Sequence, residues 1–213
     1  MKYAIFMSDV VGSMRSSHLA VSDSLSQITS LANSTWSNQL LSPLTVTLGD
    51  EFQAVARSYR DAMEVCFWID EASRRAEFPL SLRFSIVYGE ISTPINDSIA
   101  HGMIGEGLQQ ARELITKKTR RSIKYQARTG SDAVDQMLND LLSVAEAITK
   151  NWRRKDYALI DSMLRNPSDG EVGSQFGKLR QQIYKRRDTL MISEYQALKR
   201  VILKIAGTVG EDR

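Results

Sequence analysis

Apolar residues in the first 130 positions alternate between strand-like and helix-like spacing. Strands are expected where short apolar or alternating runs occur, at residues 2–8, 44–48, 51–56, 80–88 and 122–127. Helices are expected where apolar side chains recur every three to four positions, at residues 19–40, 59–75 and 105–118. A hairpin flanked by βα units is typical of an antiparallel or mixed sheet with helices on one face. Of the two, we expect an α+β fold with an antiparallel sheet.

From residue 132 onward the pattern is helical throughout, interrupted by a segment rich in Asn, Pro, Asp and Gly at residues 166–170. This change of pattern predicts the organisation of the chain. We expect an α+β domain over residues 1–130, a connecting helix over 131–150, a helical module over 151–206 and a flexible tail over 207–213.

The composition is that of a globular protein with a substantial core, since 42% of the 213 residues are hydrophobic and 25% are charged. The single cysteine, Cys66, excludes an internal disulfide and a multi-cysteine zinc site. No apolar run is long enough to span a membrane, and the N-terminal run is too short for the core of a signal peptide. We therefore expect a cytoplasmic protein without a membrane partner.

The net charge of +3 is unevenly distributed along the chain. Between Lys150 and Lys204 there are 13 basic and 6 acidic side chains, a net charge of +7, which leaves −4 for the rest. A basic module on an acidic body indicates a polyanion as partner of the module. A solvated basic helical face would have the same composition.

Two short acidic motifs stand out, Ser-Asp-Val-Val-Gly-Ser at residues 8–13 and Leu-Gly-Asp-Glu-Phe-Gln at residues 48–53. Asp9 follows the first expected strand and Asp50 lies on the hairpin turn, so both carboxylates are expected at one edge of the sheet. At about 4 Å they would repel by about 4 kcal/mol at an effective dielectric constant near 20. A Mg²⁺ ion, which takes oxygen ligands, would relieve this repulsion. The alternative is that Gly49 and Asp50 only turn the hairpin.

Residues around the two aspartates are candidates for holding phosphate. Glycines let the backbone approach a phosphate closely, and amides that lead into a helix can bind its oxygens. The candidate nucleotide- or phosphate-binding residues in the two motifs are Val10, Gly12, Ser13, Gly49 and Glu51.

These motifs resemble those of class III nucleotidyl cyclases and, more remotely, diguanylate cyclases, and the likeness continues through residues 83–91 and 107–114. Over nearly its full length the chain resembles the bacterial SatD family, which pairs such motifs with a C-terminal helix-turn-helix. The resemblance implies a ferredoxin-like, nucleotidyl-cyclase-like sheet, Mg²⁺ held by Asp9 and Asp50, a nucleotide ligand and a homodimer.

The chain departs from the cyclase pattern on the helix that follows. Cyclases place an asparagine and, four residues on, an arginine where this sequence has Gln109 and Glu113. Gln109 could still donate a hydrogen bond to a nucleotide. Glu113 would put negative charge beside the charge that develops in phosphoryl transfer. Arg112 is one position away and is expected to point roughly 100° around the helix. The pattern therefore favours binding over cyclisation and leaves catalysis open.

The segment 169–187 has the pattern of a helix-turn-helix, with Gly177 placed where a left-handed turn residue is needed. Its second helix is rich in side chains that contact phosphates and base edges. The candidate DNA-binding residues are Lys178, Arg180, Gln181, Gln182, Lys185 and Arg186. The alternative is a helical hairpin used for dimerisation.

Together these features indicate a ligand-responsive regulator, in which a Mg²⁺- and nucleotide-binding domain is coupled to a DNA-binding module in a homodimer. One alternative is a metal-dependent nucleotidyl cyclase or nucleotidyltransferase whose C-terminal helices mediate dimerisation. Another is a degenerate cyclase fold that serves only as an interaction scaffold.

Overall fold

The computed structural model describes residues 1–12, 18–47, 49–75, 80–116 and 123–210. The strands are β1 (Lys2–Val10), β2 (Leu40–Val46), β3 (Glu51–Ala56), β4 (Leu82–Glu90) and β5 (Tyr125–Arg128). The helices are α1 (His18–Thr35), α2 (Tyr59–Ser73), α3 (Glu106–Thr116), α4 (Asp132–Lys150), α5 (Tyr157–Arg165), α6 (Asp169–Gln175), α7 (Arg180–Thr189) and α8 (Ile192–Gly207). Short 3₁₀ helices occupy Ser37–Gln39 and Arg154–Asp156.

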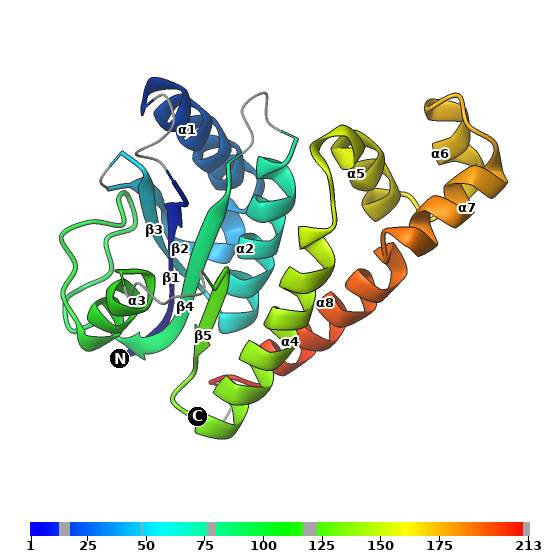
Figure 1. Cartoon of the computed structure of the whole chain (residues 1–213). Coiled ribbons are helices and arrows are strands. Elements are labelled where there is room, and N and C mark those ends of the chain that lie inside the picture. Colours follow the sequence, from blue (N-terminus) through cyan, green and yellow to red (C-terminus); the bar gives the residue numbers. More distant parts are fainter. Residues whose placement is uncertain (13–17, 48, 76–79, 117–122, 211–213) are drawn as a thin grey trace.

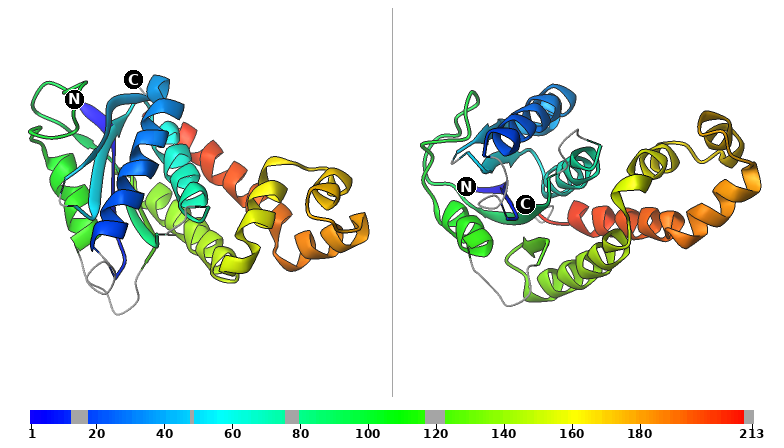
Figure 2. Two further views of the ribbon diagram at one scale, coloured as in Figure 1. Left: turned by 90° about the horizontal axis from the view of Figure 1, so that it is seen from above. Right: turned by 45° about the horizontal axis from the view of Figure 1, so that its top comes forward.

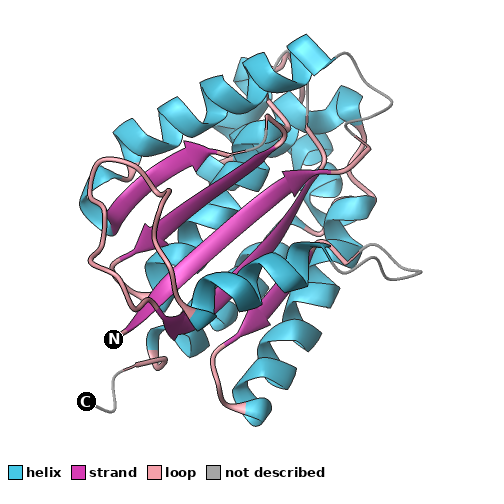
Figure 3. Ribbon diagram, turned by 90° about the vertical axis from the view of Figure 1, so that its left-hand side faces the viewer, coloured by secondary structure: helices cyan, strands magenta, loops and turns pink. Residues whose placement is uncertain are grey.

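The five strands form one sheet in the order β2-β3-β1-β4-β5, with β1 at its centre (Figure 3). Strand β1 is antiparallel to both of its neighbours, β3 and β4. The expected antiparallel sheet is corrected at one edge, because β5 runs parallel to β4. Helix α3 provides the long crossover that a parallel pair requires. The chain is therefore an α+β protein with a mixed sheet.

Helices cover both faces of the sheet, which corrects the expectation that they cover one (Figure 1). Helices α1 and α2 lie on one face, where Phe6 and Ile86 belong to the main core. Helix α3 lies on the other face, where Ile5 and Val87 form a second core with Leu108. The physical reason is that successive side chains of a strand point to opposite faces, and the central strands are apolar on both.

The β2–β3 hairpin differs in detail from its expected form. Strand β2 begins at Leu40 and ends at Val46, so the connection spans residues 47–50 and is longer than the two-residue turn expected at Gly49 and Asp50. Pro43 lies inside β2, where the pairing with β3 shifts register. An edge strand tolerates a proline because the lost amide can face away from its neighbour. Leu48 lies outside the described residues.

The last helix, α8, runs back toward the sheet-forming part of the chain and packs between α4 and α2. Tyr195 of α8 contacts the rings of Phe67 and Trp152, and the Trp152 indole donates a 2.9 Å hydrogen bond to the carbonyl of Leu190. Helices α6 and α7 lie at the far end of this arrangement, away from the sheet (Figure 2).

Helices α6 and α7 are joined by residues 176–179, where Gly177 has the expected left-handed conformation with a φ of 61°. Helix α4 occupies the segment expected to connect the two parts of the chain. Residues 208–210 continue α8 as turns, and the remainder of the expected tail lies outside the described residues. Among the helices of the described residues, none combines the length and apolarity needed to cross a membrane.

Candidate functional site

Charged side chains form a row across the three central strands where β1 ends. Asp9 of β1 lies directly opposite Glu51 of β3 on one side and Arg83 of β4 on the other. Arg83 binds Asp9 with both arms of its guanidinium, Nε to Oδ1 at 2.9 Å and Nη2 to Oδ2. Across β3, β1 and β4 the row therefore reads Glu51, Asp9 and Arg83, two acidic side chains followed by a basic one.

Helix α3, which covers this face of the sheet, adds a second arginine to the row. Arg112 donates a hydrogen bond from Nη1 to Oε2 of Glu51, so each carboxylate of the row is paired with one arginine. The helix can come this close because Gly107 lies directly on Gly89 of β4, and a Cβ on Gly107 would be 2.6 Å from the Gly89 carbonyl carbon. The Ser85 hydroxyl adds a 2.8 Å hydrogen bond to the carbonyl of Ala111.

The two acidic motifs meet through their backbones. The Val10 amide donates a 2.9 Å hydrogen bond to the Asp50 carbonyl, which places the hairpin turn beside the end of β1. The structure thus brings Asp9, Glu51 and the Asp50 backbone to one end of the sheet. Val10 itself is buried in the main core, and its amide is already bonded to Asp50. In this conformation Val10 therefore positions the hairpin rather than offering an amide to phosphate.

The two motif glycines lie on the surface at this end of the sheet. Gly12 has a φ of 77° and Gly49 a φ of 81°, in the left-handed region that favours glycine, and a Cβ on either would meet no atom of the described residues within 4 Å. Ser13, also predicted to hold phosphate, lies outside the described residues.

The residues of α3 are placed differently from the expectation. Gln109 and Glu113 are exposed on the helix, whereas Arg112, expected to point away, is the residue that reaches Glu51. Sequence reasoning also missed Arg83. Its signal was its position on an alternating strand, but only the pairing of β1 with β4 shows that it faces Asp9.

The arginines change the electrostatic argument for a metal ion. Of the two aspartates expected to repel each other, Asp9 already has its charge balanced by Arg83, and the neighbouring Glu51 is paired with Arg112. The hydrogen bond to Asp9 raises the pKa of Arg83 despite partial burial. Within the described part of the chain, no group of three or more His, Cys, Asp or Glu residues could hold a metal. The carboxylate oxygens suit Mg²⁺, but the ion would need ligand phosphates and water to complete its shell.

Most of the candidate DNA-binding residues are exposed. These five are Lys178, which precedes α7, and Arg180, Gln181, Gln182 and Lys185 on the helix. Gln182 caps the helix by accepting a 2.9 Å hydrogen bond from the Leu179 amide. Arg186 is half-buried and forms a 2.6 Å ion pair with Asp156.

Arg187, the next residue, holds α7 to the preceding helices. It bonds Asp169 at 2.9 Å and the carbonyls of Met163 and Asn166 at 2.8 and 3.0 Å. The exposed positive charge of α7 therefore comes mainly from residues near its N-terminal half.

The fold and the site define a mixed-sheet α+β protein with a charged row at one end of the sheet, and several solved nucleotide cyclases are similar to it. The guanylyl cyclase Cya2 aligns at 12% identity over 56% of this chain and 71% of its own, with a TM-score of 0.40. A bacterial light-regulated adenylyl cyclase aligns at 14% identity over 60% of this chain and 43% of its own, with a TM-score of 0.46. The guanylate cyclase domain of RhGC from Catenaria anguillulae, in complex with GTP, aligns at 14% identity over 55% of this chain and 74% of its own, with a TM-score of 0.41.

The sequence itself identifies the family. The SatD family model matches residues 3–204, so the chain belongs to the SatD family, as its motifs indicated. No curated relative matches the sequence.

Proposed function

We propose that this SatD protein is a ligand-responsive regulator, which binds a Mg²⁺–nucleotide at the end of β1 and DNA through α7. The observation that supports the ligand site is the row of two carboxylates, each paired with an arginine, near the two left-handed glycines Gly12 and Gly49. Arginine matches both carboxylate and phosphate in geometry, so each pair can exchange partners when a phosphate arrives.

A bound Mg²⁺–nucleotide would give the charged side chains of the row new partners. Phosphate oxygens would take the guanidinium groups of Arg83 and Arg112, while Asp9 and Asp50 would hold Mg²⁺. The ion would neutralise phosphate charge as well as the carboxylate of Asp9, which Arg83 releases. Neither Mg²⁺ nor nucleotide alone satisfies all of these charges, because each leaves part of the row unpaired. Binding is therefore expected to require both together.

The binding proposal predicts a cooperative thermal shift. With GTP or ATP and Mg²⁺ together at a hundredfold excess over Kd, the protein should be stabilised by about 2.7 kcal/mol, which raises Tm by several degrees. Mg²⁺ alone or nucleotide with EDTA should give a much smaller shift. Asp9→Asn should abolish the joint effect, and Asp140→Asn, an exposed carboxylate on α4, should retain it. Equal shifts in both variants would contradict the proposed site.

The same mixtures test the enzymatic alternative. Chromatography of the nucleotide after incubation would detect cyclisation or nucleotidyl transfer. Turnover lost in Asp9→Ala and Asp50→Ala would establish an enzyme rather than a pure regulator. An unchanged nucleotide together with the thermal shift supports binding alone.

The DNA proposal is supported by the placement of α7. The helix lies away from the sheet, and Lys178 just before it and Arg180 and Lys185 on it are exposed. A homodimer would present two such helices, as paired half-sites require. The dimer is part of this proposal, and sedimentation with and without the ligand measures it.

Removing two of these charges is expected to weaken DNA binding and its salt dependence together. Arg180→Ala with Lys185→Ala should lower the slope of log K against log salt by roughly two, since each phosphate contact contributes about one. Lys204→Ala, on the last turn of α8, removes the same kind of charge elsewhere and should leave binding unchanged. A mobility shift that is equal in the double variant and the control would show that α7 does not contact DNA.

A specific observation favours the alternative use of α7 as a dimer contact. Leu179 and Tyr184 are 71% and 66% exposed on this helix, more than a groove-facing helix needs. If Leu179→Glu converts a dimer to a monomer while DNA binding by the wild type is absent, the C-terminal helices serve dimerisation.

A further inference from the structure

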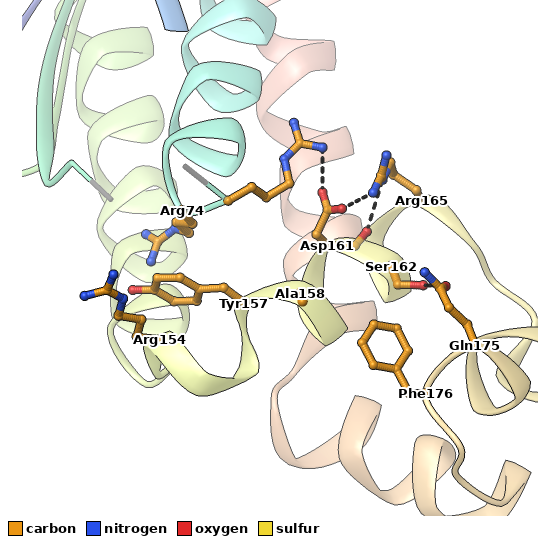
Figure 4. A pocket seen from close by; sticks show the side chains of 10 residues that line it. Arg74, Arg154, Tyr157, Ala158, Asp161, Ser162, Arg165, Gln175 and Phe176 are labelled. Atoms are coloured by element: carbon orange, nitrogen blue, oxygen red, sulfur yellow. Dashed lines mark hydrogen bonds and ion pairs between the residues drawn. The ribbon is translucent and has the colours of Figure 1, made fainter. Parts of the chain in front are cut away.

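A basic cavity lies between the C-terminal end of α2 and the helices that follow α4, separate from the charged row. It has a volume of about 430 Å³ and is lined by residues just after α2, by α5 with the turn before it, and by the end of α6 (Figure 4). This volume is within the usual range of small-molecule sites. Its walls therefore combine residues from the sheet-forming part of the chain with residues that lead to α7.

The charge of the cavity is strongly biased. Its lining residues include four arginines, Arg74, Arg75, Arg154 and Arg165, and one carboxylate, Asp161. Arg75 pairs with Asp161 at 2.9 Å, and Arg165 reaches the same carboxylate from one turn further along α5. One carboxylate shared by two arginines leaves donor groups for an additional anion, as Asp161 cannot accept from every N–H of both.

Arg74 forms the inner wall. Its guanidinium lies 5.6 Å from the centroids of the Tyr157 and Trp152 rings, and its buried Nε has no hydrogen-bond partner among the residues that the structure describes. Asp70 behind it holds one arm at 3.2 Å and keeps it charged. A buried donor without a partner beside a cavity is typical of a place where a ligand or water completes the bonding.

Two aromatic side chains complete the lining. Tyr157 and Phe176 are both drawn at the cavity in Figure 4, and near Phe176 the Ser162 hydroxyl donates a 2.7 Å hydrogen bond to the Gln175 amide oxygen. Arginine forks recognise phosphate, and aromatic faces stack on flat rings. The combination fits a ligand that carries both groups.

We propose that this cavity binds a nucleoside phosphate without a metal ion, at a site separate from Asp9. The ligand would span residues of α2 and α5. A neighbouring cavity of about 550 Å³ shares Arg74 and Tyr157 with this one and is also lined by Arg83. A ligand bound at Arg74 and Tyr157 would therefore contact a wall shared with a cavity that reaches Arg83 of the charged row, and it would also contact α5, which leads to α6 and α7.

The test uses the full chain in EDTA, where the Mg²⁺-dependent site at Asp9 does not contribute. Calorimetric titration with inorganic pyrophosphate should show binding to the wild type. The double variant Arg75→Gln with Arg165→Gln should weaken it about tenfold or more. Both side chains are partly exposed, at 30% and 67%, so the fold should tolerate the changes. Arg153→Gln, an exposed neighbour outside the cavity, is the matched control and should bind like the wild type.

A second comparison tests the aromatic part. AMP should bind more tightly than ribose 5-phosphate in EDTA, and Tyr157→Leu should reduce that preference. The proposal is overturned if pyrophosphate does not bind, if the double variant binds as the wild type does, or if Arg153→Gln weakens binding equally. Equal affinity for AMP and ribose 5-phosphate would overturn the assignment of a nucleoside phosphate. Tighter binding of single-stranded DNA than of AMP, lost in the same double variant, would also overturn it in favour of a nucleic acid.

Discussion

Replacement of Gly107 by alanine is expected to lower the free energy of unfolding by about 1–3 kcal/mol, the usual cost of forcing an extra methyl group into a packed core. The new Cβ would lie 2.6 Å from the carbonyl carbon of Gly89 and 2.7 Å from Cδ1 of Ile5. Neither the strand backbone nor a side chain in the second core can move away easily. Helix propensity by itself would favour alanine over glycine by about 1 kcal/mol. The steric clash is expected to outweigh this gain.

Gly170→Ala is the matched control for this change. Gly170 is also helical, on α6, but a Cβ there would meet nothing within 4 Å. Alanine at Gly170 should therefore be neutral or stabilising, and urea denaturation of both variants measures the difference. Equal stability of Gly107→Ala and Gly170→Ala would show that α3 does not pack as closely on β4 as it does in this structure.

The Gly107 variant should also affect the candidate site. Helix α3 carries Arg112. Arg112 can reach Glu51 because α3 packs closely on β4. A shifted helix would leave Glu51 without its arginine. The joint Mg²⁺–nucleotide shift is therefore expected to fall in this variant even at a temperature where it remains folded.

Local patterns were sufficient to predict much of this chain. Strand β1 and helix α2 fall where alternation or helical spacing placed them, because each buries one continuous set of apolar positions. Helix α4 fills the expected connecting segment for the same reason. The match of the family model over residues 3–204 confirms the resemblance that the acidic motifs indicated.

Partners that are distant in sequence could not be predicted from the same patterns. Arg83 is 74 positions from Asp9, and their contact depends on the register between β1 and β4. The face on which α3 lies depends on tertiary packing, so the approach of Arg112 to Glu51 was missed. A helical position fixes an angle around its own axis but not which face of the sheet the helix covers.

The buried charge cluster around Asp70 also joins residues that are distant in sequence. Its disruption has the largest expected effect on the free energy of unfolding. Asp70 on α2 is 2% exposed and is bound by Lys124, by Arg74 at 3.2 Å and by the Tyr125 hydroxyl at 3.0 Å. Burial raises the pKa of Asp70, but Lys124 and Arg74 outweigh it and hold that pKa below the ordinary value of 3.8. Burial lowers the pKa of Lys124 in turn. Asp70 is thus the counter-ion that allows two basic side chains to be buried.

Asp70→Asn is therefore expected to destabilise the protein by about 3–5 kcal/mol at pH 7, the cost of leaving a buried charge without its partner. A carboxylate whose pKa is lowered on folding stabilises the fold above the unfolded pKa, and that contribution is lost as the pH falls through the folded value. The gap between wild type and variant should thus be full at pH 7 and shrink below about pH 4. Urea unfolding at a series of pH values measures it.

The double variant Asp70→Asn with Lys124→Met tests whether charge is the cause. It removes one of the two unpaired cations and keeps most of the lysine's volume, so it should recover part of the lost stability. Asp140→Asn, an exposed carboxylate, should change stability by less than about 0.5 kcal/mol. A double variant less stable than Asp70→Asn would show that packing around Lys124, rather than the unpaired charge, accounts for the loss.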